Sequence, residues 1–256
     1  ACSKPTCSGI SSKPSNSSYT TASCTDCSGT RTINTGWTCN SGYHQSGSSC
    51  VQDKAAVGDI LYSDMTTASS LISGKTPIGV VFDPDRNLAA ALTHSEQKWA
   101  TSAGGASDTD ITTLSNCSSS SYTSCDTDGK SNTAKILAFG RSKGFSYPAA
   151  EYCNNYTTAG TSSGTWFLPS AHETYLLFQQ AKTVNNTRTN LLGISSLAEG
   201  GYWTSTESDN SGGISGIIRG IPWFYSYYSF TSPNSPLNNY MGKDVAQKVI
   251  AVIKYK

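Results

Sequence analysis

The residues of this chain that could recognise a partner are concentrated after residue 220. Six aromatic residues lie within eight positions: Trp223, Phe224, Tyr225, Tyr227, Tyr228 and Phe230. From Gly220 to Gly242 there is no Asp, Glu, Lys or Arg, and Ser, Asn, Gly and Pro make up much of the rest. Antibody recognition loops use the same mixture, because Tyr and Trp supply rigid contact area while Ser, Gly and Asn supply adaptable hydrogen bonds. This composition indicates a binding surface.

Burial in a core is the competing interpretation of these aromatic residues. It is favoured for Trp203, but six aromatic side chains in eight positions cannot all face inward from an extended or looped segment. Exposed aromatic clusters usually mark interfaces. The expected ligand-binding residues are Glu207, Ser208, Arg219, Ile221, Trp223, Phe224, Tyr225, Tyr227, Tyr228, Phe230, Ser232, Asn234, Asn238, Asn239 and Tyr240.

Catalytic and metal-binding patterns are sparse. Gly160-Thr-Ser-Ser-Gly164 matches the letters of a nucleophile elbow, but a polar loop and a following strand surround it, whereas the elbow joins a strand to a helix. His44, His94 and His172 form no His-Glu-x-x-His pattern. Asp126-Thr-Asp128 could begin a calcium loop, yet the next residues do not continue the ligand pattern, so an Asx-type turn before a helix is preferred. We expect no enzymatic activity, cofactor or metal.

Nine cysteines bear on the architecture, and six of them fall within the first fifty residues: Cys2, Cys7, Cys24, Cys27, Cys39 and Cys50. Residues 1–52 are therefore expected to form a small disulfide module, in which cross-links compensate for a small core. Fifteen pairings remain open. Zinc at Cys24, Cys27 and His44 is an alternative, although structural zinc sites usually show two closely spaced ligand pairs.

The other three cysteines lie in the second part of the chain. Cys117 and Cys125 are close enough in sequence to bridge each other. Cys153 then either pairs with one of them or is a buried free thiol.

The cysteine content and the charge also limit the possible location and partners of the protein. Dense disulfides favour an oxidising compartment, hence a secreted or cell-surface protein. The sequence has neither a signal peptide nor 18 consecutive apolar residues. Cys2, after Ala1, could carry a lipid anchor or pair with another cysteine. A net charge of +1 with 14% charged residues provides no basic field for nucleic acid.

Residues 53–256 are expected to form an α+β domain. Strands are predicted at 57–62, 77–82, 88–92 and 245–255, with the last paired to the first. A helix is predicted from an N-cap at Ser131 or Asn132, and another begins with Pro148 at its first position. Pro169 ends a short strand, and Ser170 with Glu173 forms a capping box before a helix at 175–181.

Two motifs in this domain resemble those of bacterial C-type-lectin-like domains: Trp166-Phe-Leu-Pro-Ser170 and Tyr202-Trp-Thr-Ser-Thr-Glu207. The resemblance covers residues 57–256 and implies a C-type-lectin-like fold with 202–206 as scaffold. The Glu-Pro-Asn and Trp-Asn-Asp triplets of calcium-dependent lectins are absent, so it does not imply calcium-dependent sugar binding. Residues 215–240 also resemble the diversified C-terminal stretch of retroelement variable proteins.

These observations lead to one expectation of function and one alternative. We expect a secreted or surface-displayed protein that binds a protein or glycan on another cell or host surface through its C-terminal stretch. The alternative is a structural or adhesive component of an envelope layer or fibre, without a diversified site.

Overall fold

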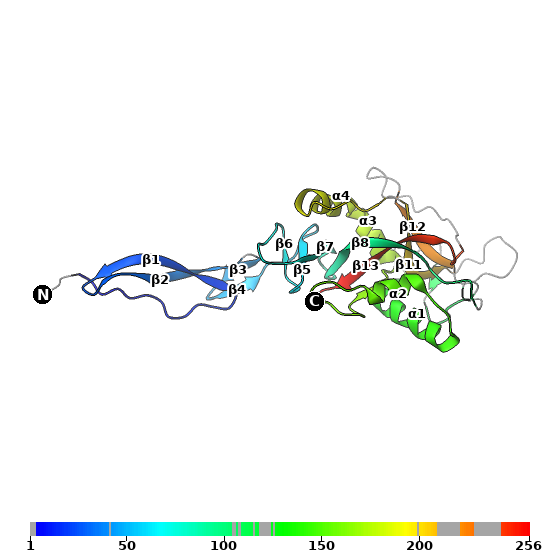
Figure 1. The fold of residues 1–256 in the computed structure, drawn as a ribbon, viewed down its shortest axis with the longest axis horizontal. Helices are drawn as coiled ribbons and strands as arrows, with labels where there is room; N and C mark the ends of the chain where they lie inside the picture. Colours follow the sequence, from blue (N-terminus) through cyan, green and yellow to red (C-terminus); the bar gives the residue numbers. More distant parts are fainter. Residues whose placement is uncertain are drawn as a thin grey trace. The chain divides into compact units, whose positions relative to one another are not determined.

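The computed structural model describes residues 4–40, 42–103, 106, 109–114, 116–117, 124, 126–198, 200–208, 221–227 and 242–256. The side chains of 52, 116, 117, 208 and 221–227 are outside this description. The chain divides into two compact units, Ala1–Lys54 and Ala55–Lys256 (Figure 1). The boundary expected from the sequence lay after residue 52.

The first unit consists of two antiparallel hairpins. The longer one pairs β1 (Ser17–Asp26) with β2 (Gly29–Cys39), and the shorter one pairs β3 (Tyr43–Ser46) with β4 (Ser49–Gln52). Most side chains of β1 and β2 are exposed or half-buried. A two-stranded ribbon is marginally stable without a packed face, so this unit depends on covalent and polar links.

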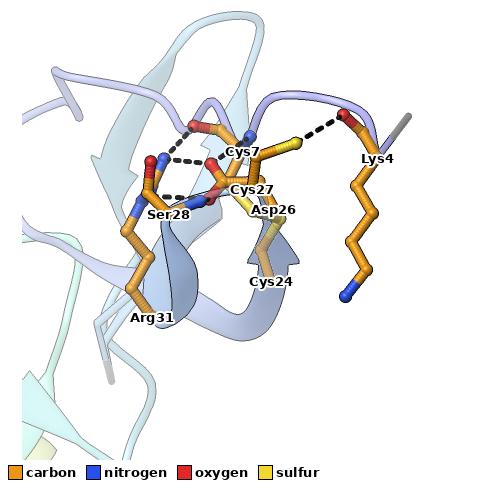
Figure 2. Close-up of polar contacts among 7 residues, drawn as sticks. All are labelled: Lys4, Cys7, Cys24, Asp26, Cys27, Ser28 and Arg31. Carbon is orange, nitrogen blue, oxygen red and sulfur yellow. Dashed lines mark hydrogen bonds and ion pairs between the residues drawn. A yellow bond between two sulfur atoms is a disulfide. The ribbon is translucent and has the colours of Figure 1, made fainter. Parts of the chain in front are cut away.

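Disulfides and one buried carboxylate supply those links (Figure 2). Cys7 is bonded to Cys24 and Cys39 to Cys50, and Cys27 is also disulfide-bonded. Cys24 is therefore not a thiolate ligand, which removes the zinc alternative. Asp26 accepts hydrogen bonds from the backbone N–H groups of Cys7 and Ser28, and these bonds lower its pKa. This carboxylate ties the N-terminal segment to the hairpin turn.

The second unit is built on one sheet with the order β12-β11-β13-β8-β7-β5-β6. Its strands are β5 (Ile60–Tyr62), β6 (Thr67–Ala68), β7 (Pro77–Asp83), β8 (Leu88–Lys98), β11 (Gly200–Ser208), β12 (Ile221–Tyr227) and β13 (Ala246–Lys254). Two short strands join from the side, β9 (Asn116–Cys117) on β11 and β10 (Trp166–Phe167) on β13. The mixed α+β class expected from the sequence is confirmed.

The predicted partner of the C-terminal strand is wrong. β13 pairs antiparallel with β8, with Ile250 opposite His94, and it does not pair with the strand at 57–62. Both edges of the three-residue β5 are already bonded, to β6 and β7. The eleven-residue β8 offers β13 a much longer edge.

Helices cover the sheet on two sides. In Figure 1, α1 (Gly129–Lys143) and α2 (Pro148–Asn155) lie below β8 and β13, while α3 (Ala171–Gln179) and α4 (Ala181–Asn186) lie above. A π-helical turn, η2 (Thr187–Leu191), follows α4. Among the described residues, no helix is both long and apolar enough to cross a membrane.

Local sequence signals predicted the helix starts unevenly. Pro148 opens α2, and the Ser170–Glu173 capping box is present, so both predictions are confirmed. α3 nevertheless starts at Ala171, before the predicted residue 175. The predicted start of α1 is also late: Asp128 is the N-cap, because its carboxylate accepts a hydrogen bond from the Ser131 N–H.

The core lies between the sheet and the helices. Its largest fully buried side chains include Trp99, Trp166, Trp203, Tyr147 and Tyr202. Residues 249–253 of β13 are all buried, as expected for a central strand covered on both faces. Cys153 is a buried free thiol, and burial raises its pKa. Cys125, the proposed partner of Cys117, lies outside the described residues.

Candidate ligand-binding surface

Part of the aromatic stretch is a strand that the sequence did not predict. β12 pairs antiparallel with β11, with Trp203 opposite Phe224 and Ser208 opposite Ile221. β12 is the last strand on the sheet path, so among the described strands it forms an edge. Pro222 is compatible with an edge because proline has no N–H to donate to a further strand.

The pairing between β11 and β12 is interrupted at Thr204–Thr206. These residues use their polar groups elsewhere: Thr204 O accepts from Trp99 Nε1 at 2.8 Å, and the Ser205 N–H donates to Pro169 O at 2.8 Å. Thr206 Oγ1 accepts from the Ala171 N–H at 2.9 Å. The two sequence motifs are thus hydrogen-bonded to each other. All three residues are buried, as are Tyr202 and Trp203, which confirms that 202–206 is scaffold.

Glu207, which was expected to be a ligand-binding residue, is buried in the structure. Its side chain is 0% exposed, and Oε1 lies 2.5 Å from Nζ of Lys243, which is 2% exposed. Glu207 Oε2 accepts from the Ile111 N–H at 3.0 Å, and Lys243 Nζ donates to Thr109 O at 2.6 Å. A buried charge needs such partners to offset its lost hydration. We call these four residues, with Trp99, the clasp.

Trp99 completes the clasp, because Lys243 Nζ lies 4.6 Å from its ring centroid. The clasp holds the chain before residue 208 against the chain after residue 242. The segment from 208 to 242 therefore begins and ends at the same point of the scaffold. Sequence reasoning missed Lys243, although it is the first charged residue after the charge-free run, and this position was the available signal.

Burial also sets the electrostatics of the clasp. It raises the pKa of Glu207 to about 7, and the nearby Asp110 carboxylate adds to the increase, while Lys243 opposes it. The pKa of Tyr147 is raised to about 12, first by burial and then by the charge of Glu207. The clasp is thus a low-dielectric polar cluster within the domain.

A second buried carboxylate, Glu173, caps two helices at once. Its Oε2 accepts from the N–H groups of Gly129 at 3.1 Å and Ser170 at 2.8 Å, at the starts of α1 and α3. A side chain at position 129 would place its Cβ 2.6 Å from Leu168 O and would overlap Glu173 Oε2, so glycine is required there. Burial raises the pKa of Glu173 to about 7.

Asp126 joins the same scaffold and leaves the calcium alternative without support. Its Oδ2 accepts from Asn132 Nδ2 at 2.5 Å and from Thr206 Oγ1 at 2.7 Å, while Oδ1 accepts from the Asp128 N–H. The preferred Asx-type turn is confirmed. No group of three or more metal-ligating side chains occurs within the described ranges.

The other predicted ligand-binding residues divide into two sets. The backbone is described for Ser208 in β11 and for Ile221, Trp223, Phe224, Tyr225 and Tyr227 in β12. Outside the described residues lie Arg219, Tyr228, Phe230, Ser232, Asn234, Asn238, Asn239 and Tyr240.

The three histidines belong to different elements. His44 pairs with Asp53 at 2.8 Å in the first unit, whereas His94 is in β8 and His172 is in α3.

Removing one charge of the clasp should destabilise the fold. Lys243→Met leaves the Glu207 carboxyl buried without its cation, so the free energy of unfolding should fall by about 3 kcal/mol. The double variant Glu207→Gln/Lys243→Met should recover most of that loss. Urea denaturation measures both. Lys98→Met, at an exposed lysine of β8, should change stability by less than about 0.5 kcal/mol. Equal losses in the single and double variants would contradict the role of the pair.

Stability should fall as pH rises through neutrality. The pKa of Glu173 is about 7 in the folded protein against an ordinary value of 4.5, so the folded state binds the extra proton. Its contribution is fully present below pH 4.5, is lost as pH rises through 7, and amounts to about 3 kcal/mol. Glu207 acts in the same direction. Urea midpoints measured at pH 5 and pH 8 test this. Glu173→Gln should flatten the dependence, and an unchanged slope would refute the assignment.

Comparison with known proteins adds one distant structural likeness. No protein-family model and no curated protein sequence matches the chain. Among solved structures, it is similar to a fimbrial protein from Bacteroides ovatus ATCC 8483, with a TM-score of 0.53 and 15% sequence identity. The match covers 94% of this chain and 57% of the fimbrial chain, so this chain spans little more than half of that protein. At this identity, the likeness is one of fold.

Proposed function

We propose that this chain is a secreted or surface-displayed protein that binds a protein or glycan target through the aromatic residues of its C-terminal stretch. The clasp carries the proposal. Glu207 is paired with Lys243, so the segment between them starts and ends at one anchored point, and its part from Gly220 to Gly242 is rich in aromatic residues and free of charged ones. Loops anchored on a rigid scaffold are the usual position for binding residues.

Two further features support a recognition role for this stretch. β12 places Trp223, Phe224 and Tyr225 on the edge strand of the described sheet. Tyr202 and Trp203 lie in the core, so the core contains aromatic residues that do not belong to β12. Clustered Trp and Tyr at an interface would carry most of the binding energy.

A C-type-lectin-like domain with a diversified C-terminal stretch is the finer form of the proposal. The hydrogen bonds between the Trp166–Ser170 and Tyr202–Glu207 motifs support a shared scaffold of that type. The encoding DNA tests diversification. A nearby template copy of codons 203–243 that differs mainly at adenines would establish it, and the absence of a template would leave an undiversified adhesin.

The disulfides support a location outside the cytosol. Cys7–Cys24 joins the N-terminal segment to β1, and Cys39–Cys50 joins β2 to β4, in a unit with few buried apolar side chains. Such cross-links persist in oxidising compartments, where a surface-displayed or secreted protein folds.

A structural or adhesive role in a fibre is the second candidate, and the fimbrial fold neighbour favours it. A fibre component would associate with copies of itself, whereas a ligand-binding protein would remain monomeric without its target. Light scattering after size-exclusion chromatography, over a range of protein concentrations, separates the two.

Replacing the aromatic side chains should abolish binding while preserving the fold. We expect Trp223→Ala/Tyr225→Ala/Tyr228→Ala to lose binding to a panel of bacterial and host cells, measured by flow cytometry of labelled protein. The melting temperature should remain nearly unchanged, because interface side chains contribute little to the core.

Trp203→Ala is the matched control, since this residue is 1% exposed. It should lose about 3–5 kcal/mol of stability. A comparable loss in the triple variant would show that the three residues are core, and retained cell binding would refute their role in recognition.

A further inference from the structure

The clasp holds an amine and a carboxyl group in direct contact in the interior. Nζ of Lys243 lies 2.5 Å from Glu207 Oε1, and the two side chains are 2% and 0% exposed. The ring of Trp99 lies beside the amine, with its centroid 4.6 Å from Nζ. Two groups held in this way need no diffusive encounter to react, and such placement can correspond to an effective concentration of about 10⁵–10⁸ M.

The remaining hydrogen bonds of the pair are those that a buried amide would need. Glu207 Oε2 accepts from the Ile111 N–H at 3.0 Å, and Lys243 Nζ donates to Thr109 O at 2.6 Å. Among the described residues, Oε1 has no partner besides Lys243. If Oε1 left, Oε2 would become an amide oxygen and Nζ would keep one N–H, and both would already have partners. An amide would also avoid the cost of burying two charges.

We propose that Glu207 and Lys243 form an intramolecular isopeptide bond. One proton passes from the Lys243 ammonium to Oε1, and the freed lone pair of Nζ attacks Cδ of Glu207. The Nζ–Cδ bond forms, the Cδ–Oε1 bond breaks, and a second proton from Nζ goes to Oε1, which leaves as water. No oxidant, cofactor or other reactant is needed, because the ammonium and the carboxylate together contain all atoms of the amide and of the water.

The surroundings of the pair favour this step. An amine forms an amide with a neutral carboxyl group more readily than with a carboxylate. Burial raises the pKa of Glu207 to about 7, and the Asp110 carboxylate adds to the rise, although Lys243 opposes it. Asp110 Oδ1 is buried and has no hydrogen-bond partner in the described part of the chain. It is therefore available to carry the second proton from Nζ to the leaving oxygen.

The bond would link the two ends of the segment from 208 to 242 covalently. A proteolytic cut within that segment would then leave both halves of the chain attached, which suits a protein outside the cell. This inference does not rest on the proposed function, since the bond can form whether or not the segment binds a target.

Mass spectrometry of the denatured full chain tests the bond. After reduction of the disulfides, we expect a species lighter than the sequence mass by one water molecule, about 18 Da, whose fraction rises while the folded protein is incubated. Trypsin should release from it residues 189–219 joined to residues 220–248, with no cleavage after Lys243. The species of full mass keeps the ion pair, and the urea comparison above applies to that species.

Lys243→Arg separates the bond from the ion pair. Its guanidinium keeps a positive charge beside Glu207 but stays protonated and cannot attack the carboxyl carbon, so this variant should keep its full mass. Lys98→Arg, at an exposed lysine of β8, should lose water as the parent does. Asp110→Asn should lower the fraction of linked protein formed in a given time, and an unchanged fraction would refute the role of Asp110.

The parent chain alone decides the main question, even where a variant does not fold. The proposal is overturned if the folded parent keeps its full mass, or if the loss of water maps to residues other than Glu207 and Lys243. It is also overturned if a folded Lys243→Arg variant shows the same linked peptides.

Discussion

Two opposite charges meet in the interior of the second unit, and the arrangement around them depends on their contact. The side chains of Glu207 and Lys243 are almost fully buried, so each must recover its lost hydration from the other and from the backbone. Glu207 receives the Ile111 N–H, and Lys243 uses Thr109 O and the face of Trp99. A change in the sequence between residues 207 and 243 would leave the scaffold intact as long as the contact between Glu207 and Lys243 was preserved.

The starts of two helices likewise depend on a single buried carboxylate. One oxygen of Glu173 serves the first turns of α1 and α3, and this requires a residue without a side chain at position 129. The hydrogen bond from Thr206 Oγ1 to Asp126 Oδ2 then connects the segment before α1 to β11. The Leu-Pro-Ser and Thr-Ser-Thr segments are therefore parts of one hydrogen-bonded unit, although about 35 residues separate them in sequence.

Local signals predicted local structure well. The Ser170–Glu173 capping box and Pro148 each act within one helical turn, and the β-branched run of β13 identifies a buried strand by composition alone. Features set by distant contacts were missed. Glu207 looks like a surface residue until Lys243 is placed beside it, and the partner of β13 depends on which edges of β5 and β8 are free. β12 was missed because its alternation is weak and Pro222 argues against a central strand.

The two ends of the main sheet differ in a way that matters for association. At one end β6 contains only Thr67 and Ala68, too short an edge to guide a further strand. At the other end β12 runs for seven residues. Proteins commonly shorten their outer strands to discourage unwanted pairing, and of the two outer strands in the described part of the sheet only β6 is short. Among the described strands, β12 is therefore the outer strand with enough backbone to pair with a further strand.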